Sequence, residues 1–444
     1  YCRYGKNIRH SAVLTVVWDD RNTWQVAAKA AYEAVVTAGQ PHNAMASALA
    51  EMDVSDVTAV LAVGKAAHGM ASEAAKAELS SPARQKGLII APDAGHNAIW
   101  PVVVAGHPVP DQGSYDGGIA AANLASSLGQ DDHLLFLLSG GASAMMILPQ
   151  LPLTLEQKMI LNERLLSSGA DIHEINAIRR LVSGIKGGRL AAMAAPARIT
   201  QMIISDVEDD ALAAIGSGPA AADPMPISQV IDSINRLGLT DLPWLQTYLE
   251  GLQNGQVMPP VRQGDACLNK ISTKIVASNR RLVQDNLLPV IAKAGGFTNF
   301  LPISLPRLSG DAAEMGRYLA EIILNHNQAE ALILGVSGGE TTVTLGRDHG
   351  KGGRSQELAV SFALRMADAD IDFPWLILAA GTDGRDGPTN AAGALLDSSM
   401  PLDSDAMERA VRRHDCWTYL NQVGGLFLPG ASGTNLADMV VILI

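Results

Sequence analysis

Short apolar runs alternate with helical patterns along most of this chain. Runs of the kind expected for buried strands lie at 57–63, 88–91, 102–105, 134–138 and 201–205. Helical patterns lie at 22–38, 66–79, 117–128, 154–168 and 187–194. This alternation predicts an α/β fold with a mainly parallel sheet. Because such sheets bind ligands where their strands end, the loops after the strands are the first place to look for function.

A polar, glycine-containing stretch with a proline pair, at 251–265, interrupts this pattern and predicts a linker. The pattern then restarts, with strands expected at 274–277, 331–336, 341–345, 375–379 and 439–443 and helices at 280–294, 311–325, 354–366 and 405–413. At 444 residues the chain is also longer than one typical core supports. We therefore predict a domain at 22–250 and a smaller one at 266–444, and we place no function in residues 1–20.

Composition excludes several classes of protein. A formal net charge of −12 argues against broad binding of nucleic acid, which needs a basic face. No apolar run is long enough to cross a membrane. The three cysteines are widely spaced, so they predict neither disulfides nor a zinc site and favour the reducing cytoplasm. Several charges flanked by glycines are nevertheless basic, namely Lys65, Lys186, Arg189, Lys351 and Arg354.

Two short strings each occur twice. Ser-Gly-Gly lies at 139–141 and 337–339, and Lys-Gly-Gly-Arg at 186–189 and 351–354. Paired glycines after a strand allow tight turns and let backbone N–H groups approach a ligand. The cationic loop at 346–354 also leads into a predicted helix, which suits an anion, although a plain surface hairpin would fit the same residues. The repetition favours the anion site, while Lys186 and Arg189 equally fit a structural role.

Charged residues follow two of the predicted strands. The strand at 57–63 ends at Gly64-Lys65, where doubly wound sheets place ligands, although Lys65 also fits an ordinary surface lysine. Asp206 follows the strand at 201–205, and carboxylates there commonly bind Mg²⁺ in phosphoryl transfer. Glu208 and Asp209 fit a helix cap as well as a metal site. In the loop at 381–394, Asp383 and Asp386 fit either metal binding or turn formation.

Common nucleotide-binding motifs are missing from the sequence. It has no GxxxxGK[ST] phosphate loop, and no GxGxxG follows a predicted strand. What remains is a set of glycine turns, lysines, arginines and carboxylates spread over two α/β halves. These are the components of phosphoryl transfer in a cleft between domains.

Eight motifs in order give the chain a family resemblance from about residue 22 to its end: GKAAHGMA, GHPVPDQGS, LLFLLSGGASAMM, EINAIRRLVSGIKGGRLA, SGGETTVTLG, GKGGRSQELA, GTDGRDGPTNAAGA and GTNLAD. Together they resemble the class II glycerate 2-kinase family, whose members carry a C-terminal MOFRL domain and were often named hydroxypyruvate reductases. The resemblance implies phosphorylation of D-glycerate at its 2-hydroxyl by ATP with Mg²⁺, giving 2-phosphoglycerate and ADP. It also implies a Rossmann-like N-terminal domain, a smaller α/β C-terminal domain and a cleft between them.

The resemblance also suggests roles for individual residues. The family's functional lysine and arginine match Lys65 and Arg354, and we expect Asp206 to join them as a metal ligand or proton acceptor. Two turns are expected to donate backbone N–H groups to phosphates, at Ser139, Gly140, Gly141 and Ser143 and at Ser337, Gly338, Gly339 and Glu340, with Lys351 nearby. The expected Mg²⁺ ligands are Asp206, Asp210 and Asp383.

The chain departs from the family pattern at a few positions, namely Asp209, Ala211, Leu212, Ala220, Ser355 and Asn390. The first of these lies beside the expected metal site. Two other classes compete with the kinase: an NAD(P)H-dependent hydroxypyruvate reductase, and a sensor that binds a sugar acid without turnover. The sequence leaves the oligomeric state open, with a homodimer as one option.

Overall fold

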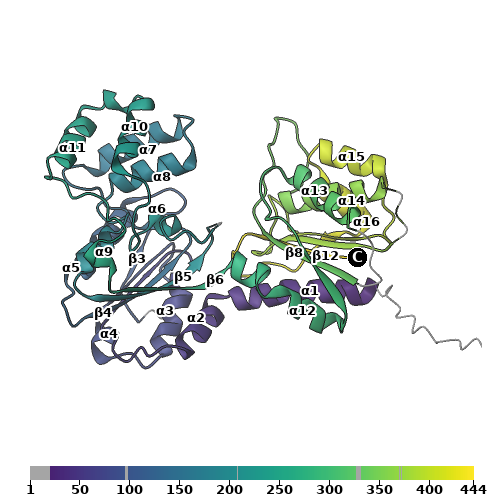
Figure 1. Cartoon of the computed structure of the whole chain (residues 1–444), viewed down its shortest axis with the longest axis horizontal. Coiled ribbons are helices and arrows are strands. Elements are labelled where there is room, and N and C mark those ends of the chain that lie inside the picture. Colours follow the sequence, from purple (N-terminus) through teal and green to yellow (C-terminus); the bar gives the residue numbers. More distant parts are fainter. Residues whose placement is uncertain (1–20, 96–98, 208, 327–331, 370, 372) are drawn as a thin grey trace, which may run out of the picture.

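The computed structural model describes residues 21–444 apart from 96–98, 208, 327–331, 370 and 372. Residues 1–20, Glu208 and the first residue of the strand expected at 331–336 therefore lie outside the described residues. Two six-stranded sheets form the molecule, and helices cover both faces of each sheet (Figure 1).

The first sheet is parallel throughout, with the strand order β3-β2-β1-β4-β5-β6. Its strands are β1 (Ala59–Val63), β2 (Gly87–Ala91), β3 (Val102–Val104), β4 (His133–Ser139), β5 (Arg198–Ser205) and β6 (Ile271–Ser278). The first five confirm the strands expected in this half. The order is that of the Rossmann fold, so the expected Rossmann-like half is confirmed.

Two elements join the sheet of the opposite half of the chain. The strand expected at 274–277 in the second half is β6, which pairs with β5 at the edge of the first sheet. Conversely, α1 (Arg21–Gly39) packs its apolar face, including Trp24, Ala28 and Tyr32, against the second sheet. Helix α11 (Pro243–Gln253) also runs into the expected linker. The domain limits at 250 and 266 therefore stay a prediction, while the sheets themselves do not divide there.

The helices of the first half form two layers and an outlying cluster. One face of the sheet carries α2 (Pro41–Ala50), α3 (Ala67–Lys76) and α4 (Ser81–Gln85), and the other α5 (Gln112–Ser126), α6 (Ala142–Met145) and α9 (Arg189–Ala194). Beyond this second face lie α7 (Leu155–Leu166), α8 (Ile172–Leu181), α10 (Ile227–Arg236) and α11, which share a small core of their own (Figure 1). Five of these helices were not expected from the sequence, namely α2, α4, α6, α10 and α11.

The second sheet is mixed, with the order β11-β10-β9-β12-β8-β7. Its strands are β7 (Phe300–Ser304), β8 (Leu332–Gly339), β9 (Leu376–Gly381), β10 (Gly393–Asp397), β11 (Leu426–Phe427) and β12 (Asp438–Leu443). Strands β7 and β8 are parallel, but the other neighbours pair antiparallel, so the expectation of a mainly parallel sheet is wrong for this half. The strand expected at 341–345 does not form, because β7 and β12 already occupy both edges of β8.

Helices also cover both faces of the second sheet. Helix α1 and α12 (Leu287–Gly295) lie on one face, and α13 (Ala312–Leu324), α14 (Arg354–Ala367), α15 (Ser404–Arg412) and α16 (Cys416–Val423) on the other (Figure 1). The helix expected at 280–294 is split into a π-helical turn, Arg280–Gln284, and α12, since Pro289 lacks the N–H that a continuous helix needs. Among the described helices, none is long and apolar enough to span a bilayer.

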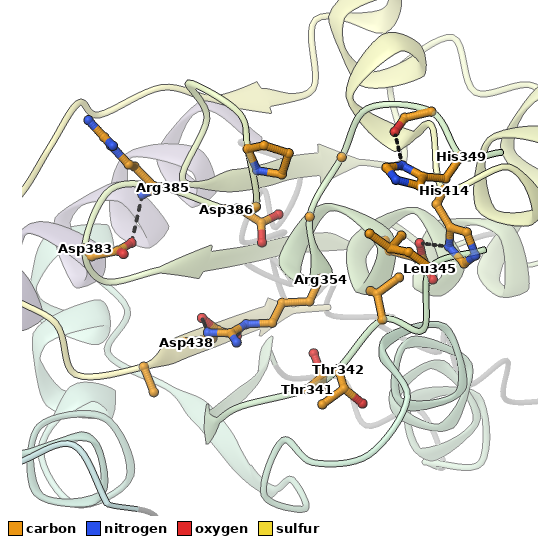
Figure 2. Close-up of a pocket in the computed structure, with 18 of the residues that line it drawn as sticks. Thr341, Thr342, Leu345, His349, Arg354, Asp383, Arg385, Asp386, His414 and Asp438 are labelled. Carbon is orange, nitrogen blue, oxygen red and sulfur yellow. Dashed lines mark hydrogen bonds and ion pairs between the residues drawn. The ribbon is translucent and has the colours of Figure 1, made fainter. Parts of the chain in front are cut away.

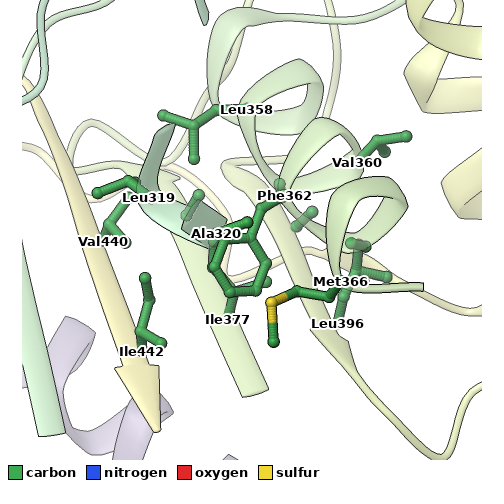
Figure 3. Close-up of a cluster of buried hydrophobic side chains, with 14 of the residues drawn as sticks. Leu319, Ala320, Leu358, Val360, Phe362, Met366, Ile377, Leu396, Val440 and Ile442 are labelled. Atoms are coloured by element: carbon green, nitrogen blue, oxygen red, sulfur yellow. The ribbon is translucent and has the colours of Figure 1, made fainter. Parts of the chain in front are cut away.

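Phe362 is at the centre of the larger core of the second half, between α14 and the sheet (Figure 3). Its ring is fully buried and meets Trp375 edge to face, with 5.6 Å between the ring centroids. We expect Phe362→Ala to lower the free energy of unfolding by about 3–5 kcal/mol, because the cavity it leaves is only partly filled. Urea denaturation measures the loss, and Tyr318→Ala, at a side chain that is 54% exposed on α13, is the control. Equal losses in the two variants would contradict this account of the core.

Candidate active site

Three residues of the predicted site follow neighbouring strands of the parallel sheet. Lys65 comes after β1, Ser139 ends β4 and Asp206 comes after β5. In the observed strand order, β1 and β4 lie side by side where the connections change direction. The carboxyl ends of strands at such a switch point form the usual ligand crevice of open α/β sheets. The fold therefore brings Lys65, Ser139 and Asp206 to one place, as the sequence predicted.

Backbone contacts fix the geometry of this first group. The Lys65 N–H donates to the Gly140 carbonyl at 2.9 Å, and the Ala66 N–H donates to Ser139 Oγ at 3.0 Å. A Cβ at Gly140 would lie 2.1 Å from Asp206 Oδ2, so only glycine lets the carboxylate approach this turn. Gly64 makes a sharp turn with φ +119°, and a Cβ there would lie 2.4 Å from Ser139 Oγ. Lys65 and Asp206 are thus held on either side of the Ser139–Gly140 turn.

The two halves of the chain enclose a cavity of about 260 Å³ at this position. The first half contributes Lys65, Ser139, Gly140 and Asp206 to its wall, and the second contributes Gly433, Thr434 and Asn435. Two contacts hold these segments together. Thr434 Oγ1 donates to the Gly39 carbonyl at 2.7 Å, and the Asn279 side chain donates to the carbonyls of Leu436 and Asp438. The expected cleft between the halves is confirmed.

His107 is a neighbour of this group that the sequence analysis did not select. A Cβ at Gly141 would lie 2.9 Å from the His107 ring, so the imidazole covers the glycine turn. Partial burial and the charge of Lys65 lower the pKa of His107, and Asp206 opposes them. The GHPVPDQGS motif could have identified His107 from the sequence, because it places this histidine just after β3.

Ser143, Lys186 and Arg189 stabilise the first half around the glycine turn. Ser143 Oγ lies 2.8 Å from Ser217 Oγ, and Lys186 Nζ donates to the carbonyl and the hydroxyl of Ser143 at 2.7 and 2.8 Å. Burial and nearby cations lower the pKa of Lys186 well below its usual value. Arg189 is buried and donates to three backbone carbonyls. These contacts support the structural alternative for Lys186 and Arg189.

A second cavity, of about 550 Å³, lies in the second half around Arg354 (Figure 2). Arg354 is the first residue of α14, and its Nε and Nη2 donate to the two carboxylate oxygens of Asp438 at 2.7 and 3.1 Å. Its Nη1 contacts the Glu340 carboxylate. Burial raises the pKa of Asp438 to about 7, although the guanidinium favours its ionised form. Asn435 lines both cavities, so the two are neighbours.

The start of α14 is not open to a ligand, contrary to the expectation for the loop at 346–354. Asp386 is buried, and its carboxylate accepts the N–H groups of Ser355 and Gln356 at 3.1 and 2.8 Å. The protein's own aspartate therefore occupies the anion position at this helix end. His414 is another pocket residue that the sequence analysis missed. Its Nδ1 lies 2.9 Å from Glu357 Oε2, and burial raises the pKa of Glu357.

The second Ser-Gly-Gly string is not a turn. Ser337, Gly338 and Gly339 are the last residues of β8 and pair with β12, and Ser337 Oγ donates to the Pro306 carbonyl at 2.5 Å. Residues 335–339 read Gly-x-Ser-x-Gly, but a strand interior cannot present Ser337 as an exposed nucleophile. The Glu340 N–H donates to the Leu308 carbonyl at 3.0 Å. The expectation that these residues form a free N–H cradle is therefore wrong.

The Lys351 side chain lies over the Trp417 ring, with Nζ 3.5 Å from the centroid. Trp417 in turn donates from Nε1 to Asn390 Oδ1 at 3.0 Å. Lys351 is not among the residues that line the second cavity, although the glycines on both sides of it are. Its role in nucleotide binding stays a prediction.

The three expected Mg²⁺ ligands do not form one set. Asp206 lines the first cavity and Asp383 the second, while Asp210 Oδ2 accepts from Ser278 Oγ at 2.8 Å. In the described part of the chain, no three His, Cys, Asp or Glu side chains are placed to hold a metal ion. The Asp206 carboxylate accepts no hydrogen bond from any described residue, so its oxygens are available. Since Mg²⁺ usually takes one or two carboxylates together with substrate phosphates and water, Asp206 alone fits such an ion.

Family models match both halves of the chain. Residues 27–250 match a domain of unknown function, DUF4147, and residues 333–438 match the MOFRL family. The D-glycerate 2-kinase of Thermotoga maritima is 31% identical over 419 residues, which cover 91% of this chain and 94% of the relative. The glycerate 2-kinase of Pyrococcus horikoshii is 33% identical over 357 residues, covering 77% and 78%. A putative hydroxypyruvate reductase of Agrobacterium vitis is 34% identical over 444 residues, covering 97% and 96%.

The crystal structure of the Thermotoga maritima glycerate kinase has the same fold. It superposes with a TM-score of 0.79 at 29% identity, covering 96% of this chain and 100% of that one. Sequence, domain order and fold agree over nearly the whole length. The chain belongs to the glycerate kinase family whose members join a DUF4147 domain to a MOFRL domain.

Proposed function

We propose that this protein transfers the γ-phosphoryl group of ATP to the 2-hydroxyl of D-glycerate, giving 2-phosphoglycerate and ADP. The observation that carries the proposal is the meeting of Lys65 and Asp206 at the switch point of the parallel sheet, in a cavity that the second half closes. Arg354 lies in the adjoining cavity, which shares Asn435 with the first. A cation and a carboxylate beside a glycine turn are the groups that phosphoryl transfer needs.

The residues of the two cavities act on different groups in this reaction. The glycerate hydroxyl oxygen forms a bond to the γ-phosphorus while the bond from that phosphorus to the ADP oxygen breaks. Lys65 stabilises the negative charge on the transferring group, and Asp206 accepts the hydroxyl proton or holds Mg²⁺, which offsets phosphate charge when it is bound. The Ser139–Gly140 turn keeps the lysine and the carboxylate in place. Arg354 binds an anionic group of one of the two substrates.

One assay in two parts tests the proposal. The purified protein, given ATP, Mg²⁺ and D-glycerate, is expected to release ADP only when glycerate is present. Because enolase acts on 2-phosphoglycerate directly, adding it without a mutase reports the position of the phosphate. The second part supplies NADH and hydroxypyruvate. NADH oxidation without formation of ADP would overturn the kinase proposal in favour of the reductase that some relatives are named for.

The widely spaced cysteines support a cytoplasmic location.

A further inference from the structure

Two carboxylates that differ greatly in exposure share the Arg354 guanidinium. The Asp438 side chain is 6% exposed, whereas that of Glu340 is 57% exposed. Asp438 begins β12, which is paired with β8 on one side and β9 on the other. Glu340 is the first residue after β8, on the surface. One carboxylate is therefore buried at the start of an inner strand, and the other is exposed to solvent.

The hydrogen-bond geometry divides the guanidinium in the same way. Asp438 takes the edge formed by Nε and Nη2, which is the two-pronged arrangement that fixes both the position and the plane of an arginine. The Nη1 end remains and contacts Glu340. Arg354 and Asp438 both line the larger cavity (Figure 2). Because Asp438 holds Nε and Nη2, Nη1 is the nitrogen left for a ligand to engage.

We infer that Asp438 is a positioning residue that aims Arg354 at the substrate, and that an anionic substrate group replaces Glu340 on Nη1. This inference rests on the proposed kinase activity. Breaking the exposed contact costs little, because water replaces it, whereas losing the buried partner would leave a charge unpaired inside the protein. The displaced position suits a carboxylate or a phosphoryl oxygen, since Glu340 itself presents an anionic oxygen there.

A double-mutant cycle tests the role of Asp438. We expect Asp438→Asn to lower kcat/KM by about 10- to 100-fold, the usual cost of removing the partner that orients a functional side chain. In an Arg354→Lys background the same change is expected to cost less than about threefold, because Asp438 acts through the guanidinium. Glu321→Gln is the matched control. It removes the carboxylate that pairs with Arg365, which lies on α14 as Arg354 does. Equal losses in both backgrounds would overturn the positioning role.

Glu340→Gln tests the second part and does not depend on the folding of the Asp438 variant. We expect the KM of one substrate to fall about two- to fivefold, the range that a single exposed ion pair gives. A fall for glycerate assigns Nη1 to its carboxylate, and a fall for ATP assigns it to a phosphate. A lower kcat/KM in this variant would overturn the displacement. If the wild-type protein forms no ADP, the proposed function fails. If it turns over normally but the effects of Asp438→Asn and Arg354→Lys are additive, only this inference is rejected.

Discussion

Replacing Lys65 with methionine is expected to lower kcat/KM for glycerate phosphorylation by about 10²- to 10³-fold. Methionine keeps the apolar stem and removes the charge that faces the cavity beside Asp206. The Lys65 backbone is bound to Gly140 and its neighbour Ala66 to Ser139, so the turn itself should survive the change. Release of ADP at varied glycerate and ATP concentrations measures the loss.

Lys76→Met is the matched control for this variant. Lys76 ends α3, the helix that Lys65 precedes, and its ammonium pairs with Glu73 on the surface. Its kcat/KM and thermal midpoint are expected to match the wild-type values. If the Lys65 variant kept kcat/KM within about threefold of wild type, Lys65 would not stabilise the transferring phosphoryl group.

The first group of the site could be predicted because it depends on strand ends alone. In a parallel sheet all strands finish at the same edge, so a lysine after β1, a serine at the end of β4 and an aspartate after β5 must converge. The apolar runs that define these strands are visible in the sequence. The same reasoning locates the sheet and its ligand crevice together, without any long-range information.

The second Ser-Gly-Gly string shows where this reasoning fails. The three residues at 139–141 end a parallel strand and turn into α6, whereas those at 337–339 are still within β8 and pair antiparallel with β12. Their glycines also have different tasks, since a Cβ at Gly338 would collide with the Asn279 side chain. The same tripeptide therefore makes different contacts in the two halves. Only the pairing of β8 with β12, which no local pattern encodes, distinguishes the two.

Asp386 illustrates a second limit. The sequence shows a cationic glycine loop before α14, which predicts an anion site. It does not show that the anion is the protein's own Asp386, which comes 31 residues after Ser355. Likewise, the pairing of Asp438 with Arg354 spans 84 residues. Tertiary contacts of this kind decided which parts of the second half line a cavity and which are closed.

Arg354→Lys is expected to lower kcat/KM by about 10²-fold, although the charge is conserved. The arginine lines the larger cavity and bonds both oxygens of Asp438 through Nε and Nη2, which leaves Nη1 for another anion. A lysine ammonium has no planar fork, so it cannot hold Asp438 and meet a substrate anion in the same fixed geometry. Steady-state kinetics at saturating ATP and varied glycerate, and the reverse, measure the change.

Arg365→Lys separates this effect from a general disturbance of α14. Arg365 lies on the same helix and donates to Glu321 from Nε at 2.6 Å, outside the cavity. We expect that variant to keep kcat/KM within about twofold of wild type, because a partly exposed ion pair contributes little. Near-normal kinetics for Arg354→Lys would exclude the guanidinium from substrate binding. The reaction would then have to be explained by the Lys65 and Asp206 cavity alone.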